Sequence, residues 1–278
     1  MDRSARQPGT SRSVEASLKY IVDTGEKPVF YAFEGGSKTT QFEGRYDDRT
    51  VAIHDGRARS GGFSLDREGF VLVPHDTAVA DFFDQAQIDS IYVGEVEALV
   101  RRVAGASRVV VFDHTLRSDA QATREAKKLR DPASVVHNDY TARSAPRRVR
   151  DLFPADEAEH LLARRFAIIN VWRSVKGTVQ TSPLALCDAQ SVAPGDLIAS
   201  ERRAKERIGE IQQATFNPAH SWYYFPDMER NEAVLIKTYD SAEDGRARYT
   251  IHTAFENPAA PPGAAPRESI ESRTFAFF

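Results

Sequence analysis

One short pattern in the sequence suits a metal ion: His137-Asn138-Asp139, at the end of an expected strand. In an extended chain, side chains two positions apart project from the same face, so His137 and Asp139 can bind one ion together. A third ligand from a distant strand would complete a set of two histidines and one carboxylate. Such a set leaves positions of an Fe(II) ion open for O2 and a chelating cosubstrate. The pattern alone is weak, because a polar strand end that leads into a loop has the same residues.

Two later histidines compete for the third position. His252 lies in the strand-like segment 249–255, whereas His220 follows Pro218 in a turn. Either side chain can also be an ordinary hydrogen-bonding histidine. His252 is favoured because an arginine and a serine, two positions apart, follow it after the loop 257–266, which is rich in Pro and Ala.

That arginine and serine, in Arg267-Glu268-Ser269, open the expected final strand and suit a terminal carboxylate. The guanidinium offers two parallel donors in a rigid fork, and the hydroxyl offers a third. Arg273 shares a strand face with Arg267 by the period of two, so it is a second candidate for the same role. Each arginine can instead be an ordinary solvated surface charge.

Short strands must position these residues, and the second half of the chain is rich in them. One helix is expected over 157–165. The regular spacing of the strands predicts an all-β sandwich or barrel. The expected strands are 134–137, 166–172, 184–187, 196–200, 221–225, 233–239, 248–254 and 269–277.

The first half mixes strands and helices. Apolar residues recur every third or fourth position over 79–103, which predicts two helices broken near 87–90. The charged segment 118–130 is expected to be a loop or an exposed helix. Expected strands are 28–33, 50–54, 70–73 and 108–114.

The expected organisation is a disordered polar tail over 1–13 and a single domain over 14–278. Within this domain, an α/β support region over about 14–130 packs against a β core over about 131–278. The charged segment 118–130 and the charged segment 141–150, which is expected to be a loop, flank the His-x-Asp strand. We expect one or both to become ordered when substrate binds.

Composition excludes several classes of protein. The 278 residues carry a formal net charge of −3, so a nucleic-acid partner is not expected. No apolar run is long enough to span a membrane. The single Cys187 excludes an internal disulfide and any multi-cysteine zinc site. With no signal-peptide pattern in the polar N-terminal residues, the expected location is cytoplasmic. The oligomeric state is left open.

Several segments together resemble one family. The chain is similar, from about Phe63 to its end, to the CmcJ-like family, which comprises the hydroxylase component of cephem methoxylation and the gibberellin desaturase-like oxygenases of secondary metabolism. The resemblance implies a double-stranded β-helix, a jelly-roll or cupin-like core with flanking helices, and an Fe(II)- and 2-oxoglutarate-dependent oxygenase. The segments are Phe112–Arg117, Asn170–Arg173, Pro183–Asp188, Trp222–Tyr224, Leu235–Ser241 and Pro266–Arg273.

The resemblance also implies roles for individual residues. Iron would be bound by His137, Asp139 and His252. The cosubstrate 2-oxoglutarate would be anchored by Arg267, assisted by Ser269 or Arg273. The loop before Arg267 is slightly longer than is common in the wider superfamily, so the choice between the two arginines stays open. The resemblance does not identify the small-molecule substrate. It also does not decide among hydroxylation, desaturation and ring closure.

Five further residues are candidates for substrate contacts. Aromatic residues on strands are more often part of a core, and a lysine within an apolar strand either points outward or pairs with an anion inside the barrel. The candidates are Asn170, Trp172, Arg173, Tyr224 and Lys237.

Two rival functions are considered. One is an iron enzyme that does not use 2-oxoglutarate and binds its substrate directly to the metal. The other is a cupin-like binding protein without turnover. Only the 2-oxoglutarate enzyme needs the pair Arg267 and Ser269, and only that enzyme forms succinate.

Overall fold

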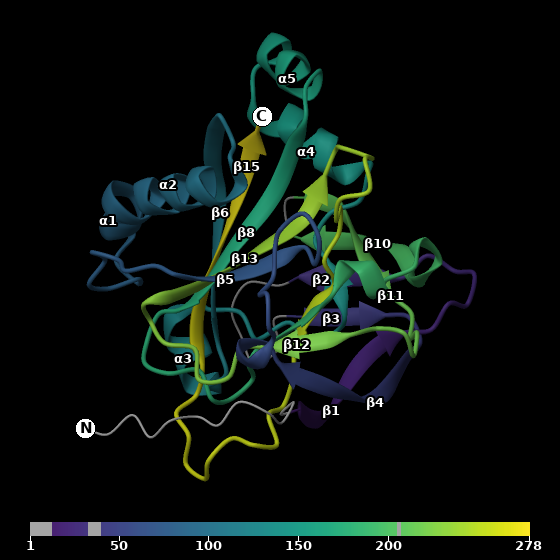
Figure 1. The fold of residues 1–278 in the computed structure, drawn as a ribbon, viewed down its shortest axis with the longest axis vertical. Helices are drawn as coiled ribbons and strands as arrows, with labels where there is room; N and C mark the ends of the chain where they lie inside the picture. The colour runs from purple at the N-terminus through teal and green to yellow at the C-terminus, as the bar shows by residue number, and fades with distance from the viewer. Residues whose placement is uncertain (1–12, 33–39, 205–206) are drawn as a thin grey trace.

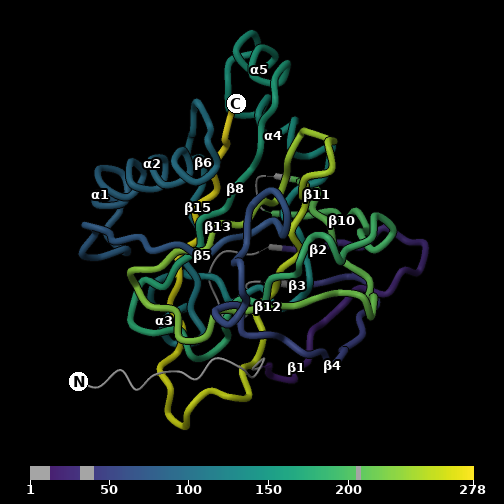
Figure 2. Tube along the Cα trace, viewed as in Figure 1, coloured from purple at the N-terminus to yellow at the C-terminus, as the bar shows by residue number. Residues whose placement is uncertain are grey.

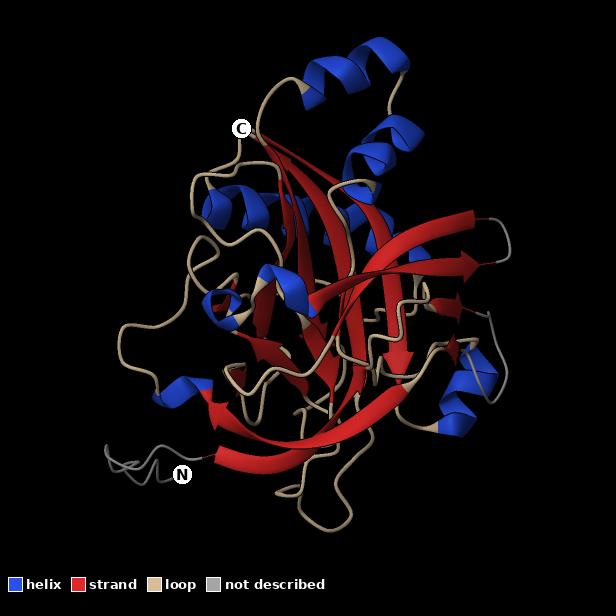
Figure 3. Cartoon of the chain, turned by 90° about the vertical axis from the view of Figure 1, so that its right-hand side faces the viewer, coloured by secondary structure: helices blue, strands red, loops and turns tan. Residues whose placement is uncertain are grey.

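A computed structural model describes residues 13–32, 40–204 and 207–278, and in it two β-sheets pack against each other. The strands form the middle of the molecule, and the helices lie at its periphery (Figure 3). The prediction of a mainly β fold with flanking helices is confirmed. Of the predicted tail 1–13, residues 1–12 lie outside the described residues, and Ser13 already begins a strand.

The larger sheet has ten strands, and most of its hydrogen-bonded neighbours are antiparallel. Strands from both ends of the chain meet in it, so residues far apart in sequence become neighbours (Figure 1). Its order is β1 (Ser13–Ile21), β4 (Tyr46–Asp55), β12 (Trp222–Tyr224), β9 (Leu184–Cys187), β14 (His252–Ala254), β7 (His137–Asn138), β11 (Arg207–Ala214), β10 (Leu197–Ala204), β2 (Val29–Ala32) and β3 (Thr40–Glu43).

The smaller sheet has five strands, and the C-terminal strand runs through it between two partners (Figure 2). Strands from before and after residue 130 lie in both sheets, and the predicted boundary at that residue stays a prediction. The order is β5 (Phe70–Pro74), β13 (Glu232–Asp240), β8 (Phe166–Ser174), β15 (Glu268–Phe277) and β6 (Arg108–Ser118).

The helix α2 (Val93–Ala104) covers the outer face of the five-stranded sheet. Val96, Leu99 and Val100 on this helix are buried against that face. The predicted break near 87–90 is wrong, because α1 (Gln85–Gln87) continues through a π-helical segment, Ile88–Tyr92, into α2. A π turn adds a residue without ending the helix, and apolar spacing alone does not distinguish the two cases.

Three further helices are α3 (Gln121–Lys127), α4 (Ser144–Leu152) and α5 (Ala155–Leu162). The segment 141–150, expected to be a loop, therefore holds most of α4. Thr141 and Ser144 explain this difference, since each backbone N–H donates to the other side-chain oxygen at 2.9 Å. These reciprocal bonds satisfy donors at the start of a helix.

Strand β8 shows why the two faces of the small sheet differ. Every residue of β8 is buried, because both faces are covered. Ala167, Ile169 and Val171 join the cluster under α2, whereas Trp172 joins a cluster between the sheets. By the period of two, Asn170 faces the interior together with Trp172. The interior face of this strand therefore carries a polar residue among apolar ones, beside the candidate site.

Candidate metal centre and adjoining cavities

The structure brings His137, Asp139 and His252 together, with ligand atoms that all lie within 4.8 Å of one another. His137 and His252 lie opposite each other where β7 pairs with β14, and their rings are 4.5 Å apart between centroids. Asp139 follows β7 and places Oδ1 3.6 Å from Nε2 of His137. Two imidazoles and one carboxylate form a set of ligands that suits Fe(II) and leaves coordination positions open.

Backbone carbonyls orient both imidazoles. Nδ1 of His137 lies 2.8 Å from the carbonyl oxygen of Val135, and Nδ1 of His252 lies 2.9 Å from that of Thr250. A carbonyl accepts only from a protonated nitrogen, so each Nδ1 carries the hydrogen and each Nε2 keeps its lone pair. Burial, with His252 nearby, lowers the pKa of His137 to about 3. The neutral ring that a metal requires is therefore the stable form at neutral pH.

The position of Thr250 depends on a glycine. Gly69 has φ +87°, and a Cβ added to it would lie 2.1 Å from Oγ1 of Thr250. Its carbonyl accepts a hydrogen bond of 3.0 Å from that hydroxyl. No other residue type fits this close contact and this backbone conformation together. Gly69 therefore helps to fix the segment that orients His252.

Two side chains hold the carboxylate of Asp139. Its Oδ2 accepts from Nδ2 of Asn170 at 2.7 Å and from Nε of Arg273 at 3.2 Å. Burial raises the pKa of Asp139, but the charge of Arg273 and the hydrogen bond from Asn170 act in the opposite direction, and the pKa lies well below its usual value. Asp139 is thus ionised and aimed, as a metal ligand must be.

On one side of the triad lies a space of about 350 Å³, part of it open solvent, which we call the inner cavity. Arg267, only 3% exposed, lies in its wall with its guanidinium 5.6 Å from the ring centre of Trp172. Nη1 of Arg267 donates to the carbonyl of Ser182, but Nε of Arg267 and Oγ of Ser269 are buried with no hydrogen-bond partner among the described residues. Buried donors without partners are costly. They mark a place for an acceptor.

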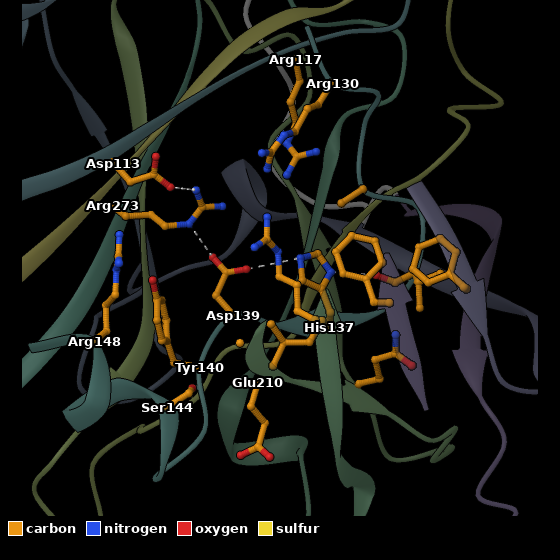
Figure 4. Close-up of a pocket in the computed structure, with 18 residues that line it drawn as sticks. Asp113, Arg117, Arg130, His137, Asp139, Tyr140, Ser144, Arg148, Glu210 and Arg273 are labelled. Atoms are coloured by element: carbon orange, nitrogen blue, oxygen red, sulfur yellow. Dashed lines mark hydrogen bonds and ion pairs between the residues drawn. The ribbon is translucent and has the colours of Figure 1, made fainter. Parts of the chain in front are cut away.

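Arg273, the rival anchor, is already surrounded by carboxylates (Figure 4). Besides Asp139, it contacts Asp113 at 2.8 Å and Glu271 at 3.4 Å. Although burial opposes its charge, these anions hold the pKa of Arg273 well above the usual value. Burial instead lowers the pKa of Arg267 to about 10. Of the two, Arg267 is the one that lacks an anion.

On another side of His137 lies a larger space of about 970 Å³, partly open to solvent, which we call the outer cavity. Tyr140, Phe30 and Phe42 contribute aromatic surface to its wall, and several arginines contribute charge. His137, Ala133 and Arg117 line both cavities. The triad therefore lies where the two spaces meet.

Of the five residues expected to contact substrate, the structure places two beside the triad or the inner cavity and three away from both cavities. Asn170 contacts Asp139, and Trp172 lines the inner cavity. Arg173, Tyr224 and Lys237 line neither cavity.

Each of these three residues makes contacts within the fold instead. Arg173 faces outward from β8 and contacts His75 at 3.0 Å. Lys237 lies 2.6 Å from Asp66 and 2.9 Å from Asp240. Tyr224 packs edge to face with Phe255.

His220, the rival ligand, lies outside the triad. Its Nε2 is 3.1 Å from Asp196, and its Nδ1 is 3.2 Å from the hydroxyl of Tyr20. These contacts occupy both ring nitrogens, which is the structural role considered from the sequence.

Several residues at the site carried no signal in the sequence. Arg130, Arg148 and Arg202 reach the outer cavity from three separate parts of the chain. Glu271, which lines the inner cavity, shares the strand face of Ser269 and Arg273. The period of two identifies Glu271 once β15 is known, but nothing local identifies the three arginines.

Comparison with known proteins gives consistent matches over nearly the whole chain. A family model described as an oxidoreductase/YMDC permease-like domain matches residues 18–277. A hydroxylase/desaturase of Cercospora beticola is 37% identical over 84% of this chain and 78% of its own length. An Fe(II)/2-oxoglutarate-dependent dioxygenase of Aspergillus novofumigatus, nvfI, is 32% identical over 97% of this chain and 98% of its own length.

Solved structures agree with the sequence matches. The iron and alpha-ketoglutarate-dependent endoperoxidase NvfI superposes with a TM-score of 0.84 at 29% identity, covering 97% of this chain and 99% of that one. A second structure of the same enzyme gives a TM-score of 0.83 at 30% identity, covering 95% of this chain and 98% of that one. The predicted double-stranded β-helix is confirmed by this likeness.

Proposed function

Since the chain belongs to this family of iron- and 2-oxoglutarate-dependent hydroxylases and desaturases, we propose that His137, Asp139 and His252 bind its iron and that Arg267 anchors its cosubstrate. The protein is an Fe(II)/2-oxoglutarate-dependent oxygenase that acts on a small molecule with O2. The resemblance to the CmcJ-like family is thereby confirmed.

The ligand set supports iron at the triad. Both Nε2 lone pairs are free to coordinate, because the Nδ1 atoms are bound to carbonyls, and Asp139 is kept ionised by Arg273. Bound there with 2-oxoglutarate, iron supplies the activation of O2 that a hydroxylase or desaturase needs. The chain would supply three ligands to the ion, at a point where the two cavities meet.

The observation that carries the cosubstrate assignment is that Arg267 and Ser269 each have a buried donor with no partner among the described residues, and that Arg267 lines the inner cavity. A dicarboxylate that chelates the metal must place its far carboxylate against a fixed cation, and Arg267 is within the cavity that His137 and His252 line. Its unpaired Nε and the hydroxyl of Ser269 would donate to that carboxylate. Trp172, under the guanidinium, keeps it in place and excludes water.

The remaining residues orient this machinery. Asn170 bridges Asp139 and Glu271, so it couples the iron site to the inner cavity. Arg273 is proposed to position Asp139 rather than to bind the cosubstrate.

The small-molecule substrate enters through the outer cavity. Among the described residues no helix has the length and apolar character of a membrane span. A cytoplasmic location stays a prediction.

Succinate formation tests this proposal. Purified protein is incubated with Fe(II), 2-oxoglutarate and O2, and succinate is measured for the wild type and for Asp139→Ala. We expect succinate from the wild type and none above background from the variant. Succinate from both proteins at equal rates would overturn the ligand assignment.

A further inference from the structure

The outer cavity contains more positive charge than its acidic residues neutralise. Of its three carboxylates, Asp113 and Asp139 both contact Arg273. The third, Glu210, is held by Lys27 and Arg143. The acidic side chains of this cavity are thus already paired with other cations.

Besides Arg273, four arginines line this cavity, and one of them, Arg148, lies over the ring of Phe112. The other three, which we call the arginine cluster, are Arg117, Arg130 and Arg202. None of them forms an ion pair with a carboxylate in the part of the chain that the structure describes. The side chains of Arg117 and Arg130 lie next to each other and project toward the cavity (Figure 4). Like charges in a partly desolvated space repel one another, and an unpaired buried charge is costly.

The cations of this cluster affect one another. Burial, together with the charges of Arg130 and Arg273, lowers the pKa of Arg202 to about 10. Burial also lowers the pKa of Arg117, with Arg273 and Arg130 contributing. An anion bound between these arginines would offset both the cost of burying their charges and the repulsion among them. The cluster is therefore arranged for a negatively charged ligand.

The same cavity offers a surface for an apolar body. Phe30 and Phe42 are stacked with their ring centres 5.0 Å apart, and Ile211 and Val135 line the wall with them. A ligand that fits this space therefore combines an apolar or aromatic part with an anionic group.

We propose that the substrate of this oxygenase is an organic anion, a carboxylate or phosphate ester, whose charged group is bound by Arg117, Arg130 and Arg202 and whose apolar body lies against Phe30 and Phe42. The proposal rests on the proposed function, because it treats the outer cavity as the substrate site. It adds the substrate class. The cosubstrate carboxylate is assigned elsewhere, to Arg267 in the inner cavity.

Calorimetric titration of three probes with one apolar body tests the proposal: 2-naphthoate, 2-naphthyl phosphate and the neutral 2-naphthamide. Each is titrated into anaerobic protein loaded with Fe(II) and 2-oxoglutarate. We expect at least one anion to bind about tenfold or more tightly than the amide, because paired charge-assisted hydrogen bonds are lost with the charge. The anion that binds more tightly distinguishes a carboxylate from a phosphate ester.

Variants locate the site. Arg130→Gln and Arg202→Gln should remove the preference for the anion and leave the 2-oxoglutarate affinity unchanged, which also shows that the proteins are folded. Arg101→Gln is the matched control, since Arg101 is exposed on α2 and lines neither cavity. It should change neither affinity.

Three results would overturn the proposal: anions that bind no more tightly than the amide, a preference that survives in both variants, or variants that lose 2-oxoglutarate and keep the anion. The last result would assign the cluster to the cosubstrate. If the wild type binds no 2-oxoglutarate, the proposed function fails instead, and the comparison of anion with amide in the metal-free protein still decides whether an anion site exists.

Discussion

His137 and His252 lie directly opposite each other in the pairing of β7 with β14, and their ring centres are 4.5 Å apart. The two residues are 115 positions apart in the sequence, yet one backbone pairing sets their separation. The hydrogen bonds from their Nδ1 atoms to Val135 and Thr250 then direct both Nε2 atoms toward Asp139. The geometry of the proposed metal site therefore follows from the register of the sheet.

Replacement of the two competing histidines gives opposite results. His252→Ala should abolish tight Fe(II) binding, because two ligands remain of three. His220→Ala should bind Fe(II) like the wild type, because His220 contacts Asp196 and Tyr20 away from the triad. Anaerobic metal titration of both variants measures this. Full iron affinity in His252→Ala would refute the assignment of the third ligand.

Removal of the amide that orients Asp139 should weaken the metal site without removing a ligand. In Asn170→Ala, Fe(II) affinity is expected to fall by about 10- to 100-fold, the usual effect of losing such a partner. Ile169→Val, on the opposite face of β8, is the matched control and should retain iron affinity with a small loss of stability. Equal iron affinity in all three proteins would show that Asn170 does not position Asp139.

Two glycines allow the steric role of Gly69 to be separated from backbone strain. Gly62 has φ +66° with nothing within 4 Å of an added Cβ, whereas Gly69 has φ +87° and Thr250 at 2.1 Å. Gly62→Ala should cost roughly 1–2 kcal/mol of stability and leave iron binding unchanged. Gly69→Ala should cost more and also weaken iron binding, because Thr250 must move and its carbonyl orients His252. Identical behaviour of both variants, by thermal unfolding and metal titration, would count against this link.

Acid should destabilise the metal-free protein before its carboxylates protonate. Burial lowers the pKa of His75, His114 and His220 in the folded state. Below the histidine pKa of about 6.5 in the unfolded chain, these residues are protonated in the unfolded state but remain neutral in the folded state. The free energy of unfolding therefore falls as the pH drops. Each histidine can contribute up to about 1.4 kcal/mol per pH unit in this range. A melting temperature that stays constant from pH 7.5 to 5.5 would contradict this prediction.

The sequence predicted those features that depend on local periodicity. Strand β9 has the expected bounds, Leu184–Cys187, and β15 begins one residue earlier than expected. Period-two alternation also separates Asn170 from Arg173, which lie on opposite faces of β8, although both were expected near the substrate. The reciprocal bonds of Thr141 and Ser144, a helix-start signal in the sequence, account for the helix that was expected to be a loop.

The arginine cluster shows what local patterns cannot predict. Arg117 lies on β6, Arg202 on β10, and Arg130 in the segment before β7. Their meeting depends on how two sheets pack, and no spacing in the sequence encodes it. The choice between Arg267 and Arg273 likewise required the structure, because the period of two places both on one strand face and only their contacts distinguish them.

Arg273 is expected to act on the metal through Asp139. In Arg273→Leu, Asp139 loses its nearest cation, so Fe(II) affinity should fall and the loss should grow as the pH is lowered, since the pKa of Asp139 rises toward its usual value. Metal titration at two pH values measures this. A variant that binds Fe(II) normally at both values but needs far more 2-oxoglutarate would transfer the role of cosubstrate anchor to Arg273.

Calorimetric titration of 2-oxoglutarate into anaerobic Fe(II)-loaded protein, wild type beside Arg267→Leu, tests the central claim most directly. Loss of a buried charge-assisted pair costs roughly 2–5 kcal/mol, so the variant should bind 2-oxoglutarate at least tenfold more weakly. Its Fe(II) affinity should equal that of the wild type, because no metal ligand has been changed. A variant that binds 2-oxoglutarate as tightly as the wild type would contradict the assignment of Arg267 and the account of the inner cavity built on it.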